Sequence, residues 1–208
     1  MRVLIFSGLF CFASCVNSQD ERESAVHHRL IGTCEGCEAV FEYGGKKLAA
    51  IDTLPDFNEP GTKIKITGTV YKPDGKTPAR DVILYIYHTN GKGIYPKRGG
   101  EKGWAKRHGY IRGWVKTGND GKYTFYTLKP GIYPDWSSPA HIHPLILEPD
   151  EKYYWLDEYN FEGDTLIGER EINPPAPRGS NGLLKLHKEG SLWVGYRDII
   201  LGKNVTGY

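Results

Sequence analysis

Apolar and polar side chains alternate along much of the chain from residue 63 onward. In Lys63–Tyr71 the isoleucines at positions 64 and 66 alternate with lysine and threonine, a period of two that predicts a half-buried strand. A run rich in β-branched and aromatic residues predicts a second strand over 82–88, and further strands are predicted over 110–116, 122–127, 141–147 and 192–201. Pro- and Gly-containing turn signals separate them, such as Pro73–Lys76 and Asn119–Gly121.

Residues 151–182 do not continue this alternation. The segment is aromatic and acidic at first and Pro-rich later, which predicts a long loop with a functional role. Sustained helical periodicity is not apparent after the N-terminal segment. The pattern therefore predicts an all-β fold, a β-sandwich of mixed and antiparallel strands with long loops.

The N-terminal residues have the character of a targeting segment, expected over 1–18. Arg2 precedes an apolar run, Val3–Ala13, that is too short for a permanent membrane span. The run ends in Phe-Ala-Ser-Cys15, which resembles the lipobox of bacterial lipoproteins, although ordinary cleavage near Ser18 is an alternative. We expect an exported protein, periplasmic or at the cell surface, with a membrane anchor if Cys15 is lipidated. After this segment we expect a polar tether over residues 19–30 and a single domain over residues 31–208.

Composition narrows the classes of function. The formal net charge is only +2, with no Lys/Arg stripe, which argues against a nucleic-acid partner. Tyr is abundant, with 14 residues, and 26 Gly and 13 Pro fit strands joined by many turns. Cys34 and Cys37 form a Cys-x-x-Cys pair, for which export favours a disulfide over a zinc site or a redox pair.

The most informative short stretch is Pro139-Ala-His-Ile-His143. Residues two apart in a strand project from the same face, so His141 and His143 lie together while Ile142 packs the other way. Two adjacent imidazoles are poor core filling but suit a metal ion. A His-x-His pair alone is weak evidence, because most such pairs are exposed or satisfied by hydrogen bonds.

Neighbouring motifs change this assessment, because the chain resembles the intradiol ring-cleavage dioxygenases over about residues 62–149. Thr117–Pro134 has the family order Thr-x-x-Asp-Gly-x-Tyr-x-Phe-x-Thr-x-x-Pro-Gly-x-Tyr-Pro, and it lies between a Gly-x-Tyr at 93–95 and the Pro-Ala-His-Ile-His run. This resemblance implies that one Fe(III) is bound by four side chains: Tyr95, Tyr133, His141 and His143. It also implies cleavage of a catechol-type ring with O2 to a muconate-type dicarboxylate.

The chemistry of these residue types agrees with the implied metal. Fe(III) is a hard cation that favours anionic oxygen donors and accepts imidazole. A bound cation stabilises a tyrosinate, which otherwise forms only near a pH of about 10. The resemblance further implies that Tyr133 leaves the metal when the catechol binds through both oxygens, and takes up a proton, which makes it a catalytic residue.

Four further residues are expected at the site on weaker grounds: Arg112, His108, Tyr110 and Trp136. Arg112 lies where family members often carry an Arg-Gly, and we expect it to stabilise negative charge on substrate or intermediate. Tyr110 and Trp136 are expected to contact the substrate ring. One departure stands out: Ser138 occupies the position just before Pro-Ala-His-Ile-His, where well-studied members carry an Arg, which puts the usual substrate in doubt.

Two rival functions share parts of this pattern. The Gly- and Pro-punctuated strands also resemble small non-catalytic β-sandwich modules, which would make the chain an exported binding module. A zinc hydrolase would use His141 and His143 with a carboxylate such as Asp135 or Glu148, although no His-Glu-x-x-His helix supports it.

Overall fold

The computed structural model describes residues 27–208. The signal peptide expected over 1–18, with Cys15, and most of the tether expected over 19–30 lie outside the described residues. The end of that tether differs from expectation, because Arg29–Leu30 form strand β1 and pair in parallel with β8 (Lys152–Trp155). These two residues therefore belong to the folded domain.

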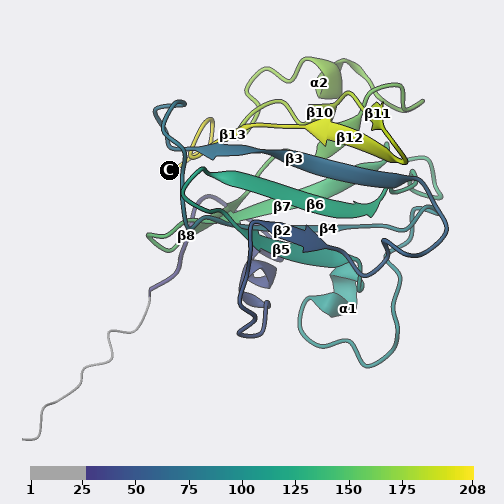
Figure 1. Cartoon of the computed structure of the whole chain (residues 1–208), viewed down its shortest axis with the longest axis horizontal. Coiled ribbons are helices and arrows are strands. Elements are labelled where there is room, and N and C mark those ends of the chain that lie inside the picture. The colour runs from purple at the N-terminus through teal and green to yellow at the C-terminus, as the bar shows by residue number, and fades with distance from the viewer. Residues whose placement is uncertain (1–26) are drawn as a thin grey trace, which may run out of the picture.

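Two sheets form the body of the protein (Figure 1), and the predicted all-β fold is confirmed. The seven-stranded sheet has the order β1-β8-β7-β4-β5, with β9 paired to β7 and β10 paired to β9. Its remaining strands are β4 (Ile83–His88), β5 (Arg112–Lys116), β7 (His141–Leu147), β9 (Tyr159–Phe161) and β10 (Leu183–Leu184). β4 pairs antiparallel with both β5 and β7 at its centre.

The second sheet has six strands in the order β11-β12-β3-β6-β2, with β13 also paired to β3. Its strands are β2 (Ile51–Thr53), β3 (Lys63–Tyr71), β6 (Lys122–Leu128), β11 (His187–Glu189), β12 (Leu192–Tyr196) and β13 (Ile199–Ile200). β3 and β6 form its long antiparallel pair. In Figure 1, α1 (Ala105–His108) and α2 (Glu169–Ile172) lie on opposite sides of the strands.

The core lies between the two sheets and follows the alternation of the sequence. On β3, Ile64 and Ile66 are fully buried while the intervening lysine is only partly so. Leu84 and Ile86 of β4 and Ile142 of β7 face them in the same cluster. Burial of such aliphatic side chains stabilises the sandwich by about 1.5–3 kcal/mol each.

The other face of the seven-stranded sheet is also covered, by the 3-10 helix η1 (Cys37–Phe41). Cys37 and Val40 of η1 cluster with Tyr85 of β4 and with Leu145 and Leu147 of β7. His141 and His143 are in phase with these two leucines, because side chains two apart share a face. The histidine pair is therefore presented on the face that η1 covers, beyond the end of its apolar cluster.

Two predictions about the C-terminal half were wrong in detail. The expected long loop over 151–182 contains β8, β9 and α2. The strand expected over 192–201 is broken at Arg197 into β12 and β13, because the Arg197 side chain is buried and its guanidinium binds backbone carbonyls of Asp157, Arg178 and Ser180.

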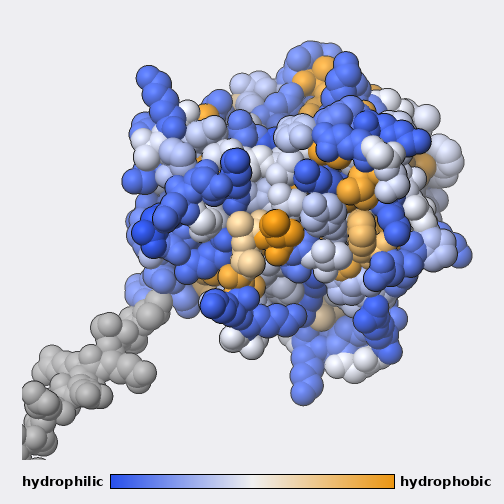
Figure 2. Space-filling model, viewed as in Figure 1, coloured by the Kyte–Doolittle hydropathy of each residue, from blue (hydrophilic) through white to orange (hydrophobic). Residues whose placement is uncertain are grey.

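The face of the protein shown in Figure 2 is predominantly polar, and its apolar side chains form separate patches among polar ones. Within residues 27–208, no helix has the length and apolar character that a membrane crossing requires.

Candidate metal centre

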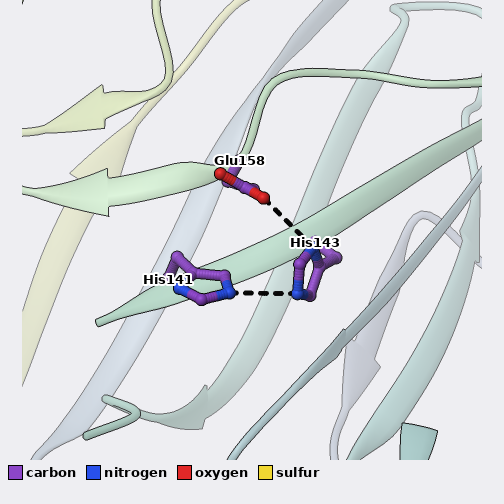
Figure 3. Close-up of side chains that lie close together, drawn as sticks. All are labelled: His141, His143 and Glu158. Atoms are coloured by element: carbon purple, nitrogen blue, oxygen red, sulfur yellow. Dashed lines mark hydrogen bonds and ion pairs between the residues drawn. The ribbon is translucent and has the colours of Figure 1, made fainter. Parts of the chain in front are cut away.

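The two histidines of β7 turn their ring nitrogens toward each other (Figure 3). Nε2 of His141 lies 3.0 Å from Nε2 of His143. Both rings are largely buried, since the residues lie at the end of β7 where β9 pairs alongside through Asn160. The strand geometry therefore places two nitrogen donors at one point, as expected from their spacing.

Two tyrosines reach the same point from separate loops. Tyr95 follows β4 and Tyr133 follows β6, and their hydroxyl oxygens are 2.9 Å apart. The Tyr95 hydroxyl is also 2.9 Å from Nε2 of His143. The structure thus brings together all four side chains that the family motifs single out: Tyr95, Tyr133, His141 and His143.

A glycine allows the two tyrosine loops to approach. Both loops have the sequence Gly-Ile-Tyr-Pro, starting at Gly93 and at Gly131. Gly93 has φ of +72°, and a Cβ atom there would lie 1.9 Å from the carbonyl oxygen of Ile132. Only glycine accepts both this conformation and this contact, so Gly93 sets the distance between the two phenols.

The hydrogen-bonding groups of the cluster leave an electron-rich gap. Nδ1 of His141 lies 2.7 Å from the Pro139 carbonyl oxygen, which only accepts, so this nitrogen carries the proton. The Glu158 carboxylate favours the same tautomer for His143, since its Oε1 is 3.5 Å from Nδ1. The two Nε2 lone pairs then face each other without a hydrogen between them.

A bound cation would accept both of the facing Nε2 lone pairs. The two phenol protons can form the hydrogen bonds between the two tyrosines and between Tyr95 and His143. No proton is then left for the contact between the two histidines. Burial, followed by the adjacent Tyr133, raises the pKa of Tyr95, and burial also lowers the pKa of His143 far below its usual range. Tyr95 and His143 are thus neutral without metal, and the two phenols and two imidazoles of the cluster fit Fe(III).

A smaller donor set overlaps this one. His141, His143 and Glu158 offer ligand atoms within 4.8 Å of one another, and Figure 3 draws the carboxylate beside His143. However, Glu158 contacts Nδ1 of His143, on the side of the ring opposite to the nitrogen that faces the other three residues. Glu158 is therefore placed to orient His143, as carboxylates do behind metal-bound imidazoles.

The carboxylates considered for a zinc hydrolase are elsewhere. Asp135 is exposed and accepts a hydrogen bond from Ser137. Glu148 binds the Tyr154 hydroxyl just beyond the far end of β7, on the order of 20 Å along the strand from His141. Neither is in a position to complete a site with the histidines.

The structure does not bring Arg112, Tyr110 or Trp136 to the four-residue cluster. The Arg112 guanidinium donates to Glu42 at 2.5 Å and lies 5.1 Å from the centre of the Trp114 ring, so it stabilises the packing around η1. The Tyr110 hydroxyl binds Glu59 at 2.7 Å. Trp136 closes the turn after Tyr133, and 65% of it is exposed.

The sequence did not indicate that Tyr87 and Glu158 would lie near the cluster. Tyr87 lies parallel to the His143 ring, with centroids 4.6 Å apart, and contacts His108 on its other side. Glu158 lies in the segment expected to be a loop, and nothing in its neighbourhood distinguished it from the other acids there. Tertiary contacts alone bring these residues to the site.

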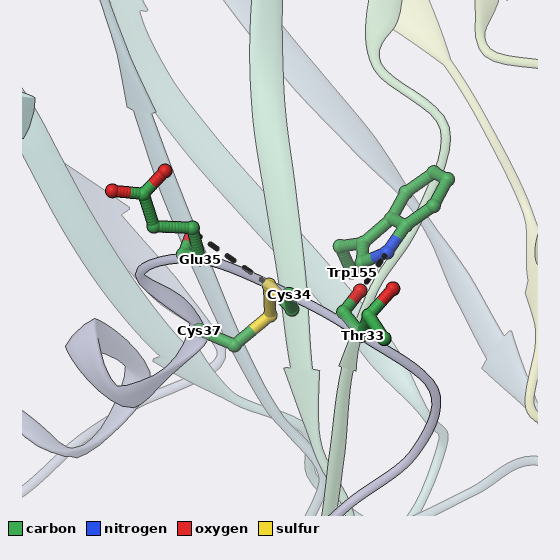
Figure 4. Close-up of a disulfide and its surroundings, with 5 residues drawn as sticks. All are labelled: Thr33, Cys34, Glu35, Cys37 and Trp155. Carbon is green, nitrogen blue, oxygen red and sulfur yellow. Dashed lines mark hydrogen bonds between the residues drawn. A yellow bond between two sulfur atoms is a disulfide. The ribbon is translucent and has the colours of Figure 1, made fainter.

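Cys34 and Cys37 form a disulfide whose Cα atoms are 5.7 Å apart (Figure 4). The bridge closes a short segment at the start of η1, and the Trp155 indole donates to the Thr33 carbonyl oxygen beside it. Glu35, between the two cysteines, borders both pockets that Tyr87 and His143 line, and Gly36 borders one of them. The disulfide segment is thus part of the wall around the candidate centre.

Behind the centre, His88 belongs to a buried polar chain. Its Nε2 lies 2.8 Å from the Thr127 hydroxyl, which also contacts the buried Asp56 carboxylate at 2.9 Å. Its Nδ1 lies 2.7 Å from the Thr89 carbonyl oxygen. The chain ties β4 to β6, the two strands from which the tyrosine loops depart.

His88 is expected to make the metal-free protein less stable in acid. Burial lowers the pKa of His88 to about 4 from its ordinary 6.5, so the unfolded chain takes up a proton that the folded chain does not. The free energy of unfolding should therefore decrease as the pH falls from 6.5 toward 4, by up to about 3 kcal/mol. Urea unfolding at several pH values measures this slope.

The variant His88→Gln is the control for this dependence of the unfolding free energy on pH. It lacks the titrating ring, while Asp56, whose pKa burial raises and whose effect on the slope has the opposite sign, stays in place. The variant should be less stable at pH 7 but should lose less stability on acidification. An equal slope in both proteins would contradict the role assigned to His88.

Comparisons with known proteins agree with this geometry. The sequence model of the Dioxygenase_C family, described as Dioxygenase, matches residues 40–178. Catechol 1,2-dioxygenase 1 of Acinetobacter lwoffii is 32% identical over 158 residues, covering 65% of this chain and 49% of that protein. The chain thus spans about half the length of that relative.

Two further proteins extend the similarity. The protocatechuate 3,4-dioxygenase beta chain of Burkholderia cepacia is 29% identical over 185 residues, covering 79% of this chain and 77% of that protein. The dioxygenase domain of a carbohydrate-binding fusion protein from Streptomyces sp. SirexAA-E shares the fold, with a TM-score of 0.53 and 24% identity over 69% of this chain and 82% of that chain. From its family match, its relatives and its fold, the chain belongs to the intradiol ring-cleavage dioxygenase family.

Proposed function

We propose that this protein cleaves a catechol-type ring between its two hydroxylated carbons with O2, giving a muconate-type dicarboxylate. Fe(III) would be held by Tyr95, Tyr133, His141 and His143. The observation that carries the proposal is the convergence of two phenols and two imidazoles, with hydroxyl and Nε2 atoms 2.9–3.0 Å apart. Family membership supports the same chemistry.

Bound iron would supply a Lewis acid that draws electron density from the catechol and prepares the ring for O2. The protein's own groups then have separate roles. Tyr95 and Tyr133, as phenolates, balance part of the metal charge. The Tyr133 hydroxyl oxygen is also the group that takes up a proton released by a substrate hydroxyl, because Tyr133 borders the pocket beside the centre.

Ser138 bears on which catechol is used. It lines a pocket with His141 and Glu158, where other members of the family are expected to carry an arginine. A serine cannot offer a charged planar donor to the substrate. The substrate would therefore draw its charge stabilisation from another part of the site.

The reaction is tested by product analysis. The iron-loaded protein, supplied with catechol and isotopically labelled O2, should yield an acyclic dicarboxylate that keeps all ring carbons and contains both labelled atoms. Mass spectrometry separates this product from a quinone, which gains no oxygen. Quinone alone, or an unchanged catechol, would contradict the proposal.

Glu158→Gln is expected to weaken iron binding about tenfold, because a carboxylate behind a ligating imidazole fixes the ring and raises its basicity. Competition against a chelator measures the affinity. Glu162→Gln is the control, since Glu162 is an exposed acid nearby that pairs with Lys185. Equal affinity in the Glu158 variant and the control would remove this role.

We also propose that the protein acts outside the cytoplasm, with Cys15 as a lipid anchor. The disulfide between Cys34 and Cys37 supports this, because such bonds persist mainly in oxidising compartments. Metabolic labelling with a fatty acid should mark the wild type and fail with Cys15→Ser. Unlabelled wild-type protein that is secreted in free form would contradict the anchor and leave export intact.

A further inference from the structure

A pocket of about 260 Å³ opens beside the candidate centre. Tyr95, Tyr133 and His143 border its inner part, and Glu35 and Arg107 border it from the disulfide segment and from α1. This volume is below the roughly 300–1,000 Å³ typical of sites for drug-sized ligands. It is suited to a single substituted ring.

Stacked aromatic rings form one wall of this pocket. Trp104 stacks on His108 with centroids 5.5 Å apart, His108 on Tyr87 at 3.7 Å, and Tyr87 on His143 at 4.6 Å. The interplanar angles are all 25° or less. The wall therefore runs from α1 to the histidine of the centre, and a planar ring bound at the centre can lie along it.

An ion pair closes the α1 end of this wall. Arg107, next to His108 in α1, donates from Nη1 to the Glu35 carboxylate. Figure 4 shows Glu35 projecting from the segment that the disulfide closes, on the side away from Trp155. Gly36 makes the approach to α1 feasible, since a Cβ there would lie 3.0 Å from Nε2 of His108.

This ion pair is weak enough for a ligand to replace. The side chains are 66% (Arg107) and 69% (Glu35) exposed, and exposed pairs contribute little to stability. A guanidinium binds a carboxylate through two parallel hydrogen bonds, whichever molecule supplies the carboxylate. A substrate anion can therefore take the place of Glu35 at small cost.

We propose that Arg107 binds a carboxylate on the side chain of a catechol-type substrate, and that Glu35 competes with it for the guanidinium. The substrate class is then a catechol whose acidic group is carried away from the two ring hydroxyls, along the aromatic wall. This inference rests on the proposed ring cleavage. It assigns the choice among catechols to the facing surfaces of α1 and the disulfide segment.

Among residues 27–208, one other arginine or lysine lines a pocket that contains His141 or His143, and it is the rival for this role. Arg170 of α2 borders the pocket that contains Ser138 and His141, together with the acids Asp157, Glu158 and Glu171. Three acids beside one arginine make that pocket unfavourable for an anion. Of the described residues, Glu35 is the only acid that lines the pocket of Arg107, so we place the carboxylate there.

The test compares charged and neutral catechols on the iron-loaded protein. Relative to 4-methylcatechol, the kcat/KM for 3,4-dihydroxyphenylacetate or 3,4-dihydroxycinnamate should fall about tenfold in Arg107→Gln and rise a few-fold in Glu35→Gln. Arg107→Lys should lie between wild type and Arg107→Gln. Lys106→Gln, which removes an exposed charge from the same helix, should leave the ratio unchanged.

Binding without turnover provides the second readout. Calorimetry with 4-hydroxyphenylacetate and 4-methylphenol, which have no second hydroxyl to cleave, should show the same charge selectivity and the same response to both variants. An unchanged ratio in Arg107→Gln, or a loss in Arg170→Gln instead, would overturn the assignment to Arg107 while ring cleavage stands. If no catechol of either charge is cleaved or bound, the proposed function fails and this inference fails with it.

Discussion

His143→Ala is expected to abolish iron retention and ring cleavage. Its Nε2 contacts both the Tyr95 hydroxyl and Nε2 of His141, so the ring lies at the middle of the four-residue cluster. Losing a partner behind a metal-bound histidine already weakens metal binding by about 10–100-fold, so loss of a ligand should exceed 100-fold. Iron content after chelator challenge, with catechol turnover, measures both effects.

His187→Ala is the control for that variant. His187 is an exposed histidine of β11 that pairs with Glu189, away from the centre. It should keep wild-type iron content and activity. If His143→Ala also kept iron through a chelator challenge, the centre would lie elsewhere in the protein.

Gly93→Ala is expected to be nearly as damaging, although it leaves all four proposed ligands in place. Its φ of +72° disfavours alanine, and the new Cβ would lie 1.9 Å from the Ile132 carbonyl oxygen and 3.0 Å from the Tyr133 Cα. The two tyrosine loops must therefore move apart. We expect a loss of roughly 2–4 kcal/mol in unfolding free energy and, in protein that still folds, about 100-fold in turnover.

Gly91→Ala provides the matched control in the same loop. A Cβ at Gly91 meets no atom within 4 Å, and its φ lies outside the left-handed region. This variant should retain stability and iron binding. Equal damage from both substitutions would mean that the loop is sensitive to any change, and that the Gly93 contact does not set the distance between the phenols.

Alternation in one segment, and runs of β-branched and aromatic residues between turn signals in others, were sufficient to predict the strands that carry the site. β3, β4, β5, β6 and β7 lie within about two residues of the predicted segments. The same patterns failed over 151–182, because β8 and β9 are only four and three residues long and are too short to show a recognisable pattern. They also could not show that burial of the Arg197 side chain would break the last strand.

The candidate centre could be predicted only in part. The strand period brought His141 and His143 together, and the family motifs added Tyr95 and Tyr133. Arg112 was assigned to the site by position, but Glu42, which follows η1, binds its guanidinium. A short-range pattern does not indicate which acid will lie beside a strand residue when the two are 70 positions apart.

The pocket walls could not be predicted for the same reason. Tyr87, Trp104, Arg107 and Glu35 come from a strand, a helix and a disulfide segment that meet only in the folded protein. Their sequence neighbourhoods contain aromatic and charged residues like those of many surface segments. The choice of substrate thus depends on contacts that no motif in this chain records.

The most direct test of the central claim is the visible absorption spectrum of the iron-loaded protein before and after addition of catechol without O2. The proposed centre predicts a broad tyrosinate-to-iron charge-transfer band that shifts when catechol binds and weakens in Tyr133→Phe. A protein that remains colourless after exposure to iron, or whose band is unchanged by Tyr133→Phe, would contradict iron binding by these tyrosines.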